Sequence, residues 1–216
     1  MKLIDQIYCS IEKAIIAEDE QLSLEELRKV LELITTSYNQ IEDKSEFYYL
    51  IGYCWYLFPL DSLERRNNIV SHLQRSVSIN PHNHFARLYL GHHYFDQNEF
   101  FLALKSFELV DLEYFASIEQ KWRALKTTEL ILSCGMKVNN KLDVATALSL
   151  IKAYEELGAI ESPLPTELIR SLSNFLKANK IDSDIKEVVD ELSGLMLKFE
   201  ITEIFEEEYL SLKQSC

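Results

Sequence analysis

Apolar residues recur at intervals of three and four along nearly the whole 216-residue chain. Ile4, Ile7 and Ile11 form one such stripe, and Leu27 and Leu31 belong to another. This spacing places apolar side chains on one face of an α-helix, and no stretch alternates for long enough to predict a strand. Only 5 residues are Gly and 4 are Pro, so the turn residues that sandwiches and barrels need are scarce. The sequence therefore predicts an all-α fold.

The expected helices are of similar length and are joined by short polar links, which favours antiparallel neighbours. A closed bundle and a stack of helix pairs both satisfy this pattern, and an internal repeat would favour the stack. Helix starts are predicted at Ser23 and Asp61, because each is followed by Glu at the spacing of a capping box. The expected helices span residues 2–17, 23–41, 45–57, 61–79, 83–96, 99–112, 117–137, 141–157, 165–179, 183–198 and 200–213.

Five residues in the middle of the chain keep the spacing of a known helical repeat. They are Leu90, Gly91, Tyr94, Ala103 and Phe107. The two small residues, Gly91 and Ala103, suit a close crossing of two antiparallel helices, and the larger side chains fill the space beside it. Residues 84–117 therefore resemble a unit of the tetratricopeptide-repeat (TPR) family. The alternative is an irregular helical bundle in which this spacing arose by chance.

A weaker unit precedes this one. Gly52 follows an isoleucine within a similar first-helix pattern, and Ile69, Leu73 and Ser76 are the corresponding residues of the second helix. The next such glycine lies 39 positions further on, whereas the family repeat is about 34 residues long. We expect the surplus residues in the segment 59–65.

The resemblance covers residues 45–140, in which Trp122 begins a third and weaker unit. It implies a short TPR-like α-solenoid of antiparallel helix pairs, with extra helices that cap both ends. We expect a single helical domain over residues 1–216, with an N-terminal helix pair at 1–44 and acidic helices at 141–216.

Three tyrosines, Tyr49, Tyr53 and Tyr56, are spaced four and three apart, so they share one face of a helix. In TPR stacks the first helix of each pair lines a concave groove, and tyrosine is a favoured interface residue. The resemblance therefore implies an aromatic partner-binding groove, unless the C-terminal helices cover it and make the tyrosines core. The implied groove positions are Tyr49, Tyr53, Tyr56, Phe85, Leu88, His92, Phe95, Arg123, Thr127 and Leu130.

The net charge of −13 is unevenly distributed. Residues 182–208 contain ten acids and two bases, and residues 1–44 contain ten acids and five bases. Phosphate backbones repel such a chain, so no nucleic acid is expected as a partner, whereas a basic protein is attracted. Glu206, Glu207 and Glu208 are candidates for contact with that protein, or they form a solvated helix face.

Four of the five histidines lie close together, at His82, His84, His92 and His93, and Asp96 follows them. A metal site is the alternative that this cluster suggests, although adjacent His92 and His93 point about 100° apart on a helix. The chain has no HExxH, GxSxG, P-loop, GxGxxG or CxxC motif. We therefore expect no enzyme, no catalytic residue, no metal and no cofactor.

The cysteines, Cys9, Cys54, Cys134 and Cys216, are far apart in the sequence, which favours free thiols in a reducing cytoplasm. The longest uncharged apolar-rich run, residues 48–60, is too short to cross a bilayer, so no membrane is expected as a partner.

The sequence predicts a non-catalytic protein–protein interaction protein. Its more concrete form is an inhibitor or immunity protein that neutralises a basic partner such as a toxin. A TPR-like adaptor or regulator that binds a peptide or helix in the groove is the alternative. A metal-dependent hydrolase that uses the His82–His93 cluster is the third and least favoured hypothesis. No oligomeric state follows from the sequence.

Overall fold

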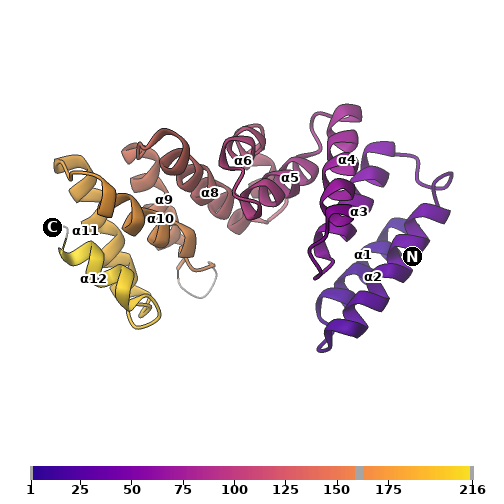
Figure 1. The fold of residues 1–216 in the computed structure, drawn as a ribbon, viewed down its shortest axis with the longest axis horizontal. Coiled ribbons are helices and arrows are strands. Elements are labelled where there is room, and N and C mark those ends of the chain that lie inside the picture. The colour runs from indigo at the N-terminus through magenta and orange to yellow at the C-terminus, as the bar shows by residue number, and fades with distance from the viewer. Residues whose placement is uncertain (1, 159–162, 215–216) are drawn as a thin grey trace. The chain divides into compact units, whose positions relative to one another are not determined.

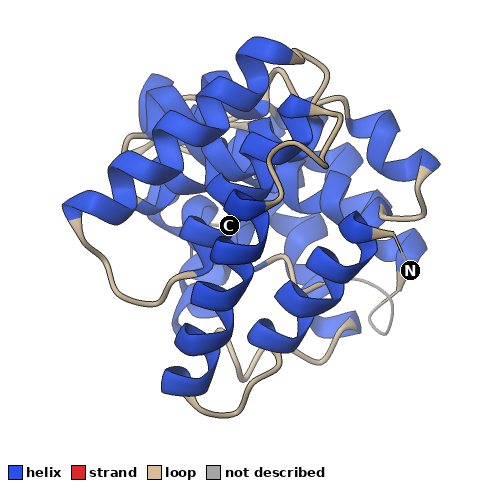
Figure 2. Cartoon of the chain, turned by 90° about the vertical axis from the view of Figure 1, so that its right-hand side faces the viewer, coloured by secondary structure: helices blue, strands red, loops and turns tan. Residues whose placement is uncertain are grey.

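The computed structural model describes residues 2–158 and 163–214. The predicted all-α fold is confirmed, because these residues form helices and links and contain no strand (Figure 2). Cys216 lies outside the described residues. The helices, most of which are labelled in Figure 1, are α1 (Leu3–Ile15), α2 (Glu20–Thr36), α3 (Lys44–Leu57), α4 (Leu63–Ile79), α5 (His84–Asp96), α6 (Phe100–Phe107), α7 (Leu112–Ser117), α8 (Lys121–Asn139), α9 (Val144–Leu157), α10 (Thr166–Ala178), α11 (Ser183–Lys198) and α12 (Glu206–Gln214).

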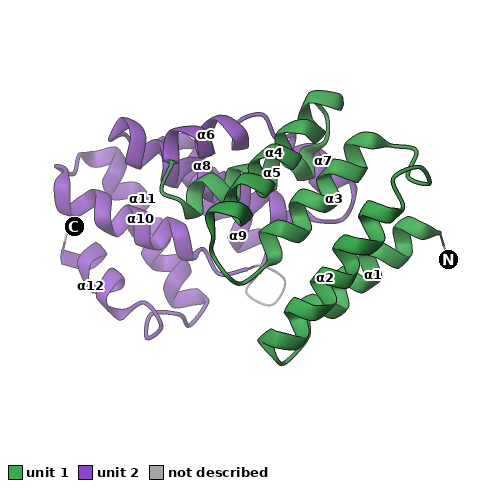
Figure 3. Ribbon diagram, turned by 45° about the vertical axis from the view of Figure 1, so that its right-hand side comes forward, with its two compact units in different colours: residues 1–99 green, residues 100–216 purple. Residues whose placement is uncertain are grey.

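The chain divides into two compact units, residues 1–99 with α1 to α5 and residues 100–216 with α6 to α12 (Figure 3). This division falls inside the segment 84–117, whose two main helices, α5 and α6, belong to different units. The expected single domain, with boundaries after residues 44 and 140, stays a prediction, as does the TPR resemblance.

In the first unit, α3 and α4 pack closely along their length. Gly52 makes this possible, because a Cβ atom there would lie 2.7 Å from both Cγ and Cδ2 of Leu73. Nearer the start of α3 and the end of α4, the hydroxyls of Ser45 and Ser76 lie 3.0 Å apart and are buried. Ile69, Leu73 and Ser76 are all fully buried on α4. Gly52, Ser45 and Ser76 are thus the small residues at which α3 and α4 come close together.

Two predicted helix starts are wrong. Helix α2 begins at Glu20 rather than at Ser23, because the Asp19 carboxylate accepts hydrogen bonds from the amides of Gln21 and Leu22, at 2.7 and 3.0 Å. Helix α4 is capped by Ser62, whose Oγ accepts from the amide of Arg65 at 3.1 Å. In both places a neighbouring residue supplies the acceptor for the free amides of the first turn.

The structure also contains a short helix, α7, most of which falls in residues 113–116, the link that the sequence analysis expects between its helices 99–112 and 117–137. Asp111 starts it by accepting hydrogen bonds from the amides of Glu113 and Tyr114, at 3.0 and 3.3 Å. Helix α6 had already ended at Phe107. A local cap therefore divides a stretch whose apolar spacing alone suggests longer helices.

The second unit has a hydrophobic core to which α8, α9, α10, α11 and α12 contribute. Leu168, Leu172 and Leu192 are among its fully buried members. Within the same unit lies a fully buried carboxylate, Glu129 of α8. Its Oε1 accepts from the backbone amide of Leu168 at 2.8 Å and its Oε2 from the hydroxyl of Tyr154 at 3.0 Å, and it forms an ion pair with Lys126.

Candidate functional site

Aromatic rings from α3 and α5 gather into one cluster, which we call the aromatic face. It consists of Tyr49, Tyr53 and Tyr56 of α3 and Phe85, Tyr89 and His92 of α5. Both helices use the same spacing, four residues and then three, which keeps each set of rings on one side of its helix. Helices α3 and α5 pack against each other, so the two sets meet.

The ring pairs show that α3 and α5 run parallel. Tyr49 lies 5.9 Å from Phe85 between ring centroids, Tyr53 lies 4.3 Å from Tyr89, and Tyr56 lies 6.4 Å from His92. The partners therefore advance together along both helices. Tyr49 and Tyr53 are stacked, with centroids 5.7 Å apart and an angle of 7° between the rings. The spacing and tilts suit favourable aromatic contacts.

Tyr89 is the centre of the aromatic face, and the sequence analysis missed it. Its ring contacts those of Tyr49, Tyr53, Tyr56 and His92. The groove positions implied by the TPR resemblance select Leu88 instead, which is only 2% exposed. The signal that could have found Tyr89 was the spacing of residues 85, 89 and 92, which repeats that of residues 49, 53 and 56.

Burial divides the predicted groove residues into two groups. Tyr49 is 3% exposed, so with Leu88 it offers a partner almost no area. Tyr53, Tyr56, Phe85, His92 and Phe95 are half-buried and keep part of their side chains at the surface. The accessible part of the aromatic face is therefore formed by the later two tyrosines of α3 and by the two ends of the α5 set.

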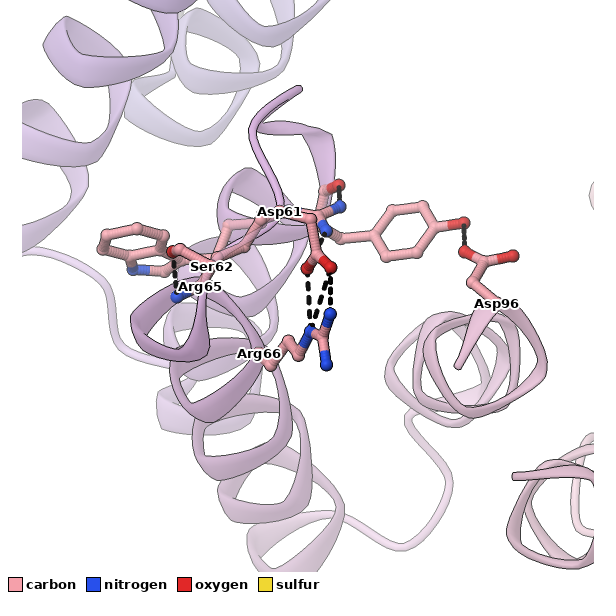
Figure 4. A network of polar contacts seen from close by, with 7 residues as sticks. Asp61, Ser62, Arg65, Arg66 and Asp96 are labelled. Atoms are coloured by element: carbon pink, nitrogen blue, oxygen red, sulfur yellow. Dashed lines mark hydrogen bonds and ion pairs between the residues drawn. The ribbon is translucent and has the colours of Figure 1, made fainter. Parts of the chain in front are cut away.

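A carboxylate stands at each end of the aromatic face. At the start of α3, Glu46 accepts a hydrogen bond from the hydroxyl of Tyr8 at 2.5 Å. At the end of α5, Asp96 Oδ2 accepts one from the hydroxyl of Tyr56 at 3.0 Å (Figure 4). Burial raises the pKa of both carboxyls above their ordinary values, and their tyrosine partners oppose the rise.

Arg65 holds the C-terminal end of α3 in place. Arg65 of α4 donates hydrogen bonds from Nε to the backbone carbonyl of Trp55, at 3.1 Å, and from a terminal nitrogen to that of Tyr56, at 2.6 Å. Asp61 forms an ion pair with Arg66, drawn in Figure 4, and lies 3.6 Å from Arg65. This network fixes the end of the helix that presents Tyr56 to Asp96.

The other predicted contact residues belong to the second unit. Arg123 of α8 donates from Nε to Oε1 of Gln120 at 2.6 Å, and its guanidinium lies 4.3 Å from the ring centroid of Trp122. Glu206, Glu207 and Glu208 form the first turn of α12, where carboxylates are stabilised by the helix dipole. Thr127 and Leu130 of α8 are buried.

The histidines do not form a metal centre. His82 and His84 have ring centroids 6.1 Å apart, and His92 belongs to the aromatic face. His93 is 4% exposed, and burial, with help from Arg65, lowers its pKa. Within residues 2–158 and 163–214, no three His, Cys, Asp or Glu side chains come together as ligands for a metal ion.

The thiols are separate in the fold. Cys9 is exposed, whereas Cys54 and Cys134 are buried, and burial raises the pKa of each of these two to about 12. Neither is therefore a nucleophile at neutral pH. None of the described helices combines the length and the apolar character needed to span a membrane.

Comparison of the chain with protein-family models, with curated proteins and with solved structures found no match.

On its geometry, the candidate site is the aromatic face, an accessible patch of rings between two carboxylates. Such a patch suits the binding of side chains that are flat, apolar or positively charged.

Proposed function

We propose that this protein is a non-catalytic protein-binding protein whose aromatic face receives a basic segment of a partner, as an inhibitor or immunity protein would. The aromatic face carries the proposal. Its half-buried rings offer stacking surfaces for Arg or Lys, and Glu46 and Asp96 stand where the charges of those side chains would be neutralised. A cation over an aromatic ring gains about 0.5–2 kcal/mol.

The net charge supports a basic partner. The chain carries −13, and Glu206, Glu207 and Glu208 contribute to the most acidic stretch of the sequence. Charge of this kind accelerates association with a positive partner more than it slows dissociation. We propose that the acidic segments speed association with the partner and that the aromatic face makes the contacts that slow its dissociation.

The test is capture of partners by variants of the full chain. Tyr53→Ser with Phe85→Ser removes two accessible rings of the aromatic face. The control, Phe101→Ser with Trp122→Ser, removes two exposed aromatic residues elsewhere, which are 54% and 41% exposed. We expect one basic protein to be captured by the parent and the control and lost with the first variant, while circular dichroism shows all three folded. Equal capture by both variants would contradict the proposal.

A functional assay then separates an inhibitor from an adaptor. The captured partner is purified and its activity, or its toxicity on expression, is measured with and without this protein. Neutralisation supports the inhibitor, and a partner that stays fully active in the complex indicates an adaptor instead. Changing Glu206, Glu207 and Glu208 together to Gln should slow association at low salt and leave the dissociation rate nearly unchanged.

A further inference from the structure

A second surface of the first unit combines exposed leucines with carboxylates, and we infer that it binds an amphipathic helix of another protein, with Lys or Arg flanking its apolar stripe. The surface surrounds an open pocket of about 500 Å³, which we call the α2 pocket. The lining comes from α2 and from the link between α3 and α4. It includes Asp19, Glu20, Leu24, Glu25, Arg28 and Leu60.

The apolar part of this surface includes exposed side chains. Leu60 of the lining is 65% exposed, and Leu63, which lies three positions further along the chain, is 74% exposed. Leu24 of the lining packs against a small core that contains the buried residues Leu27 and Phe58. The apolar side chains of this region thus form an inner layer that is covered and an outer layer that is not.

The link that carries the exposed leucines is firmly anchored. Between Leu60 and Leu63, Asp61 forms its ion pair with Arg66, and Ser62 caps α4. Arg65 in turn holds the carbonyls at the end of α3. The link is therefore held on both sides while its leucines point away from the core. Exposed leucines on a fixed support are what a docking surface for an apolar stripe requires.

The charge around the α2 pocket selects the partner. Three carboxylates line it against one guanidinium, that of Arg28. Asp19 already caps α2, and the nearby ion pair joins Lys29 to Glu26. In the described part of the chain, Glu20 and Glu25 therefore keep charges that no Lys or Arg in ion-pair contact offsets. A basic flank on the docked helix would complement them.

The same charges disfavour other kinds of partner at the α2 pocket. Nucleic acids and anionic lipid surfaces would be repelled by Glu20 and Glu25. A second copy of this chain would bring like charges together, since residues 18–26 contain five acids and no base. The pocket is also within the range of volumes that take side chains or small ligands rather than a whole domain. A short helix that inserts apolar side chains and flanks them with bases fits all of these limits.

This inference does not rest on the proposed function, because it uses α2 and the α3–α4 link rather than the aromatic face. The probe is a synthetic, fluorescein-labelled peptide of about 18 residues, with Leu at the spacing of an amphipathic helix and Lys at the other positions. Its binding to the full chain is measured by fluorescence anisotropy at about 0.15 M salt. A second peptide, with Ser in place of Leu, reports binding by charge alone.

Two pairs of variants locate the binding. Leu60→Ser with Leu63→Ser is compared with Leu197→Ser and Ile204→Ser, which change residues 54% and 65% exposed in the second unit. Glu20→Lys with Glu25→Lys is compared with Glu187→Lys and Glu191→Lys, which alter the net charge equally at exposed positions of α11. Circular dichroism confirms that each variant is folded.

We expect each α2-pocket variant to weaken binding of the Leu/Lys peptide about tenfold or more, and each control variant to change it less than about twofold. The Ser peptide should bind at least about tenfold more weakly to the parent. The inference would be overturned if the Glu20/Glu25 variant and the Glu187/Glu191 variant weakened binding equally. It would also be overturned if the Leu60/Leu63 variant bound the peptide as well as the parent does. A photo-crosslinker in the peptide gives a readout that needs no variant: it should attach to residues 19–28 or 59–63, and attachment elsewhere would also overturn it.

Discussion

Both units start several helices at a local side-chain cap, which Asp111, Asp143 and Asp182 supply in the second unit, but α10 of the second unit starts differently. In the first unit, Asp19, Ser62 and Asn83 each cap the helix that follows them in the chain. In the second unit, α10 begins after Pro165, which supplies no side-chain cap. Glu129 of α8 bonds the first turn of α10 instead, across 39 positions of sequence. The start of α10 thus depends on the tertiary structure, whereas the capped helix starts of both units are local.

The interiors of the two units also differ. The first unit brings small residues to the α3–α4 crossing and leaves aromatic side chains partly exposed beside it. The second unit encloses an ionisable carboxylate, that of Glu129, whose partners are the Leu168 amide, the Tyr154 hydroxyl and Lys126. A closely packed crossing is sensitive to added volume, whereas a buried charge is sensitive to loss of its partners. The two units should therefore be destabilised by opposite kinds of substitution.

The largest effect is expected in the second unit. Glu129→Ala removes the acceptor for the Leu168 amide and the Tyr154 hydroxyl, and it leaves Lys126 without its ion-pair partner. We expect the free energy of unfolding to fall by about 3–5 kcal/mol, as for other broken buried pairs. Denaturant unfolding measures the loss, and thiol labelling shows whether Cys134 becomes reactive before Cys54. A loss of unfolding free energy below about 1 kcal/mol would mean that Glu129 contributes no more than a carboxylate in a solvent-exposed ion pair.

The next effect is expected in the first unit. Gly52→Leu places a side chain where even a Cβ atom would lie 2.7 Å from Leu73. Overpacking of this kind costs about 1–3 kcal/mol or more. The free energy of unfolding, measured in denaturant, should fall by that amount, and Cys54 should be the first buried thiol to react. If Cys134 reacted first, the comparison between the units would fail.

Alkaline pH should affect both units alike. Cys54 and Cys134 have folded-state pKa values of about 12, above the ordinary value of 9.0. Each raised pKa contributes stability below pH 9, which is lost as pH rises from 9 toward 12 because the unfolded chain ionises first. We expect each thiol to account for a loss of about 1 kcal/mol between pH 9 and 10. Cys54→Ser and Cys134→Ser should each make the measured decline in unfolding free energy shallower, and an unchanged slope in either variant would show that its thiol is not protected.

The smallest expected effect is a gain in stability. Gly135 of α8 and Gly194 of α11 are helical, and a Cβ atom on either would meet nothing within 4 Å. Ala at each position should raise the free energy of unfolding by about 0.5–1 kcal/mol, because Gly costs more backbone entropy than Ala in a helix. Thermal melts of Gly135→Ala and Gly194→Ala, compared with that of Gly52→Ala, measure how the effect of an added methyl group differs between open and closely packed positions. Destabilisation at residue 135 would indicate a close approach there.

The sequence by itself determined the fold class and most helix positions, because both follow from local spacing. The recurrence of apolar residues predicts helices, and the predicted end of α3 at residue 57 and of α4 at residue 79 agree with the structure. The interval of four and three also places Tyr49, Tyr53 and Tyr56 on one side of α3. Where caps compete within a few residues, as at Asp19 and Ser23, spacing alone chose the wrong one.

Only the tertiary structure decided which face residues are core. Tyr49 and Tyr53 have equivalent positions in the sequence pattern, yet Tyr49 is buried and Tyr53 keeps accessible area, since neighbouring helices cover one and not the other. The central place of Tyr89 depends on the parallel packing of α3 and α5. The role of Glu129 depends on α8 meeting the start of α10. Each of these joins residues that are far apart in the chain, and their pairing is set by how whole helices pack, which the local spacing of side chains does not encode.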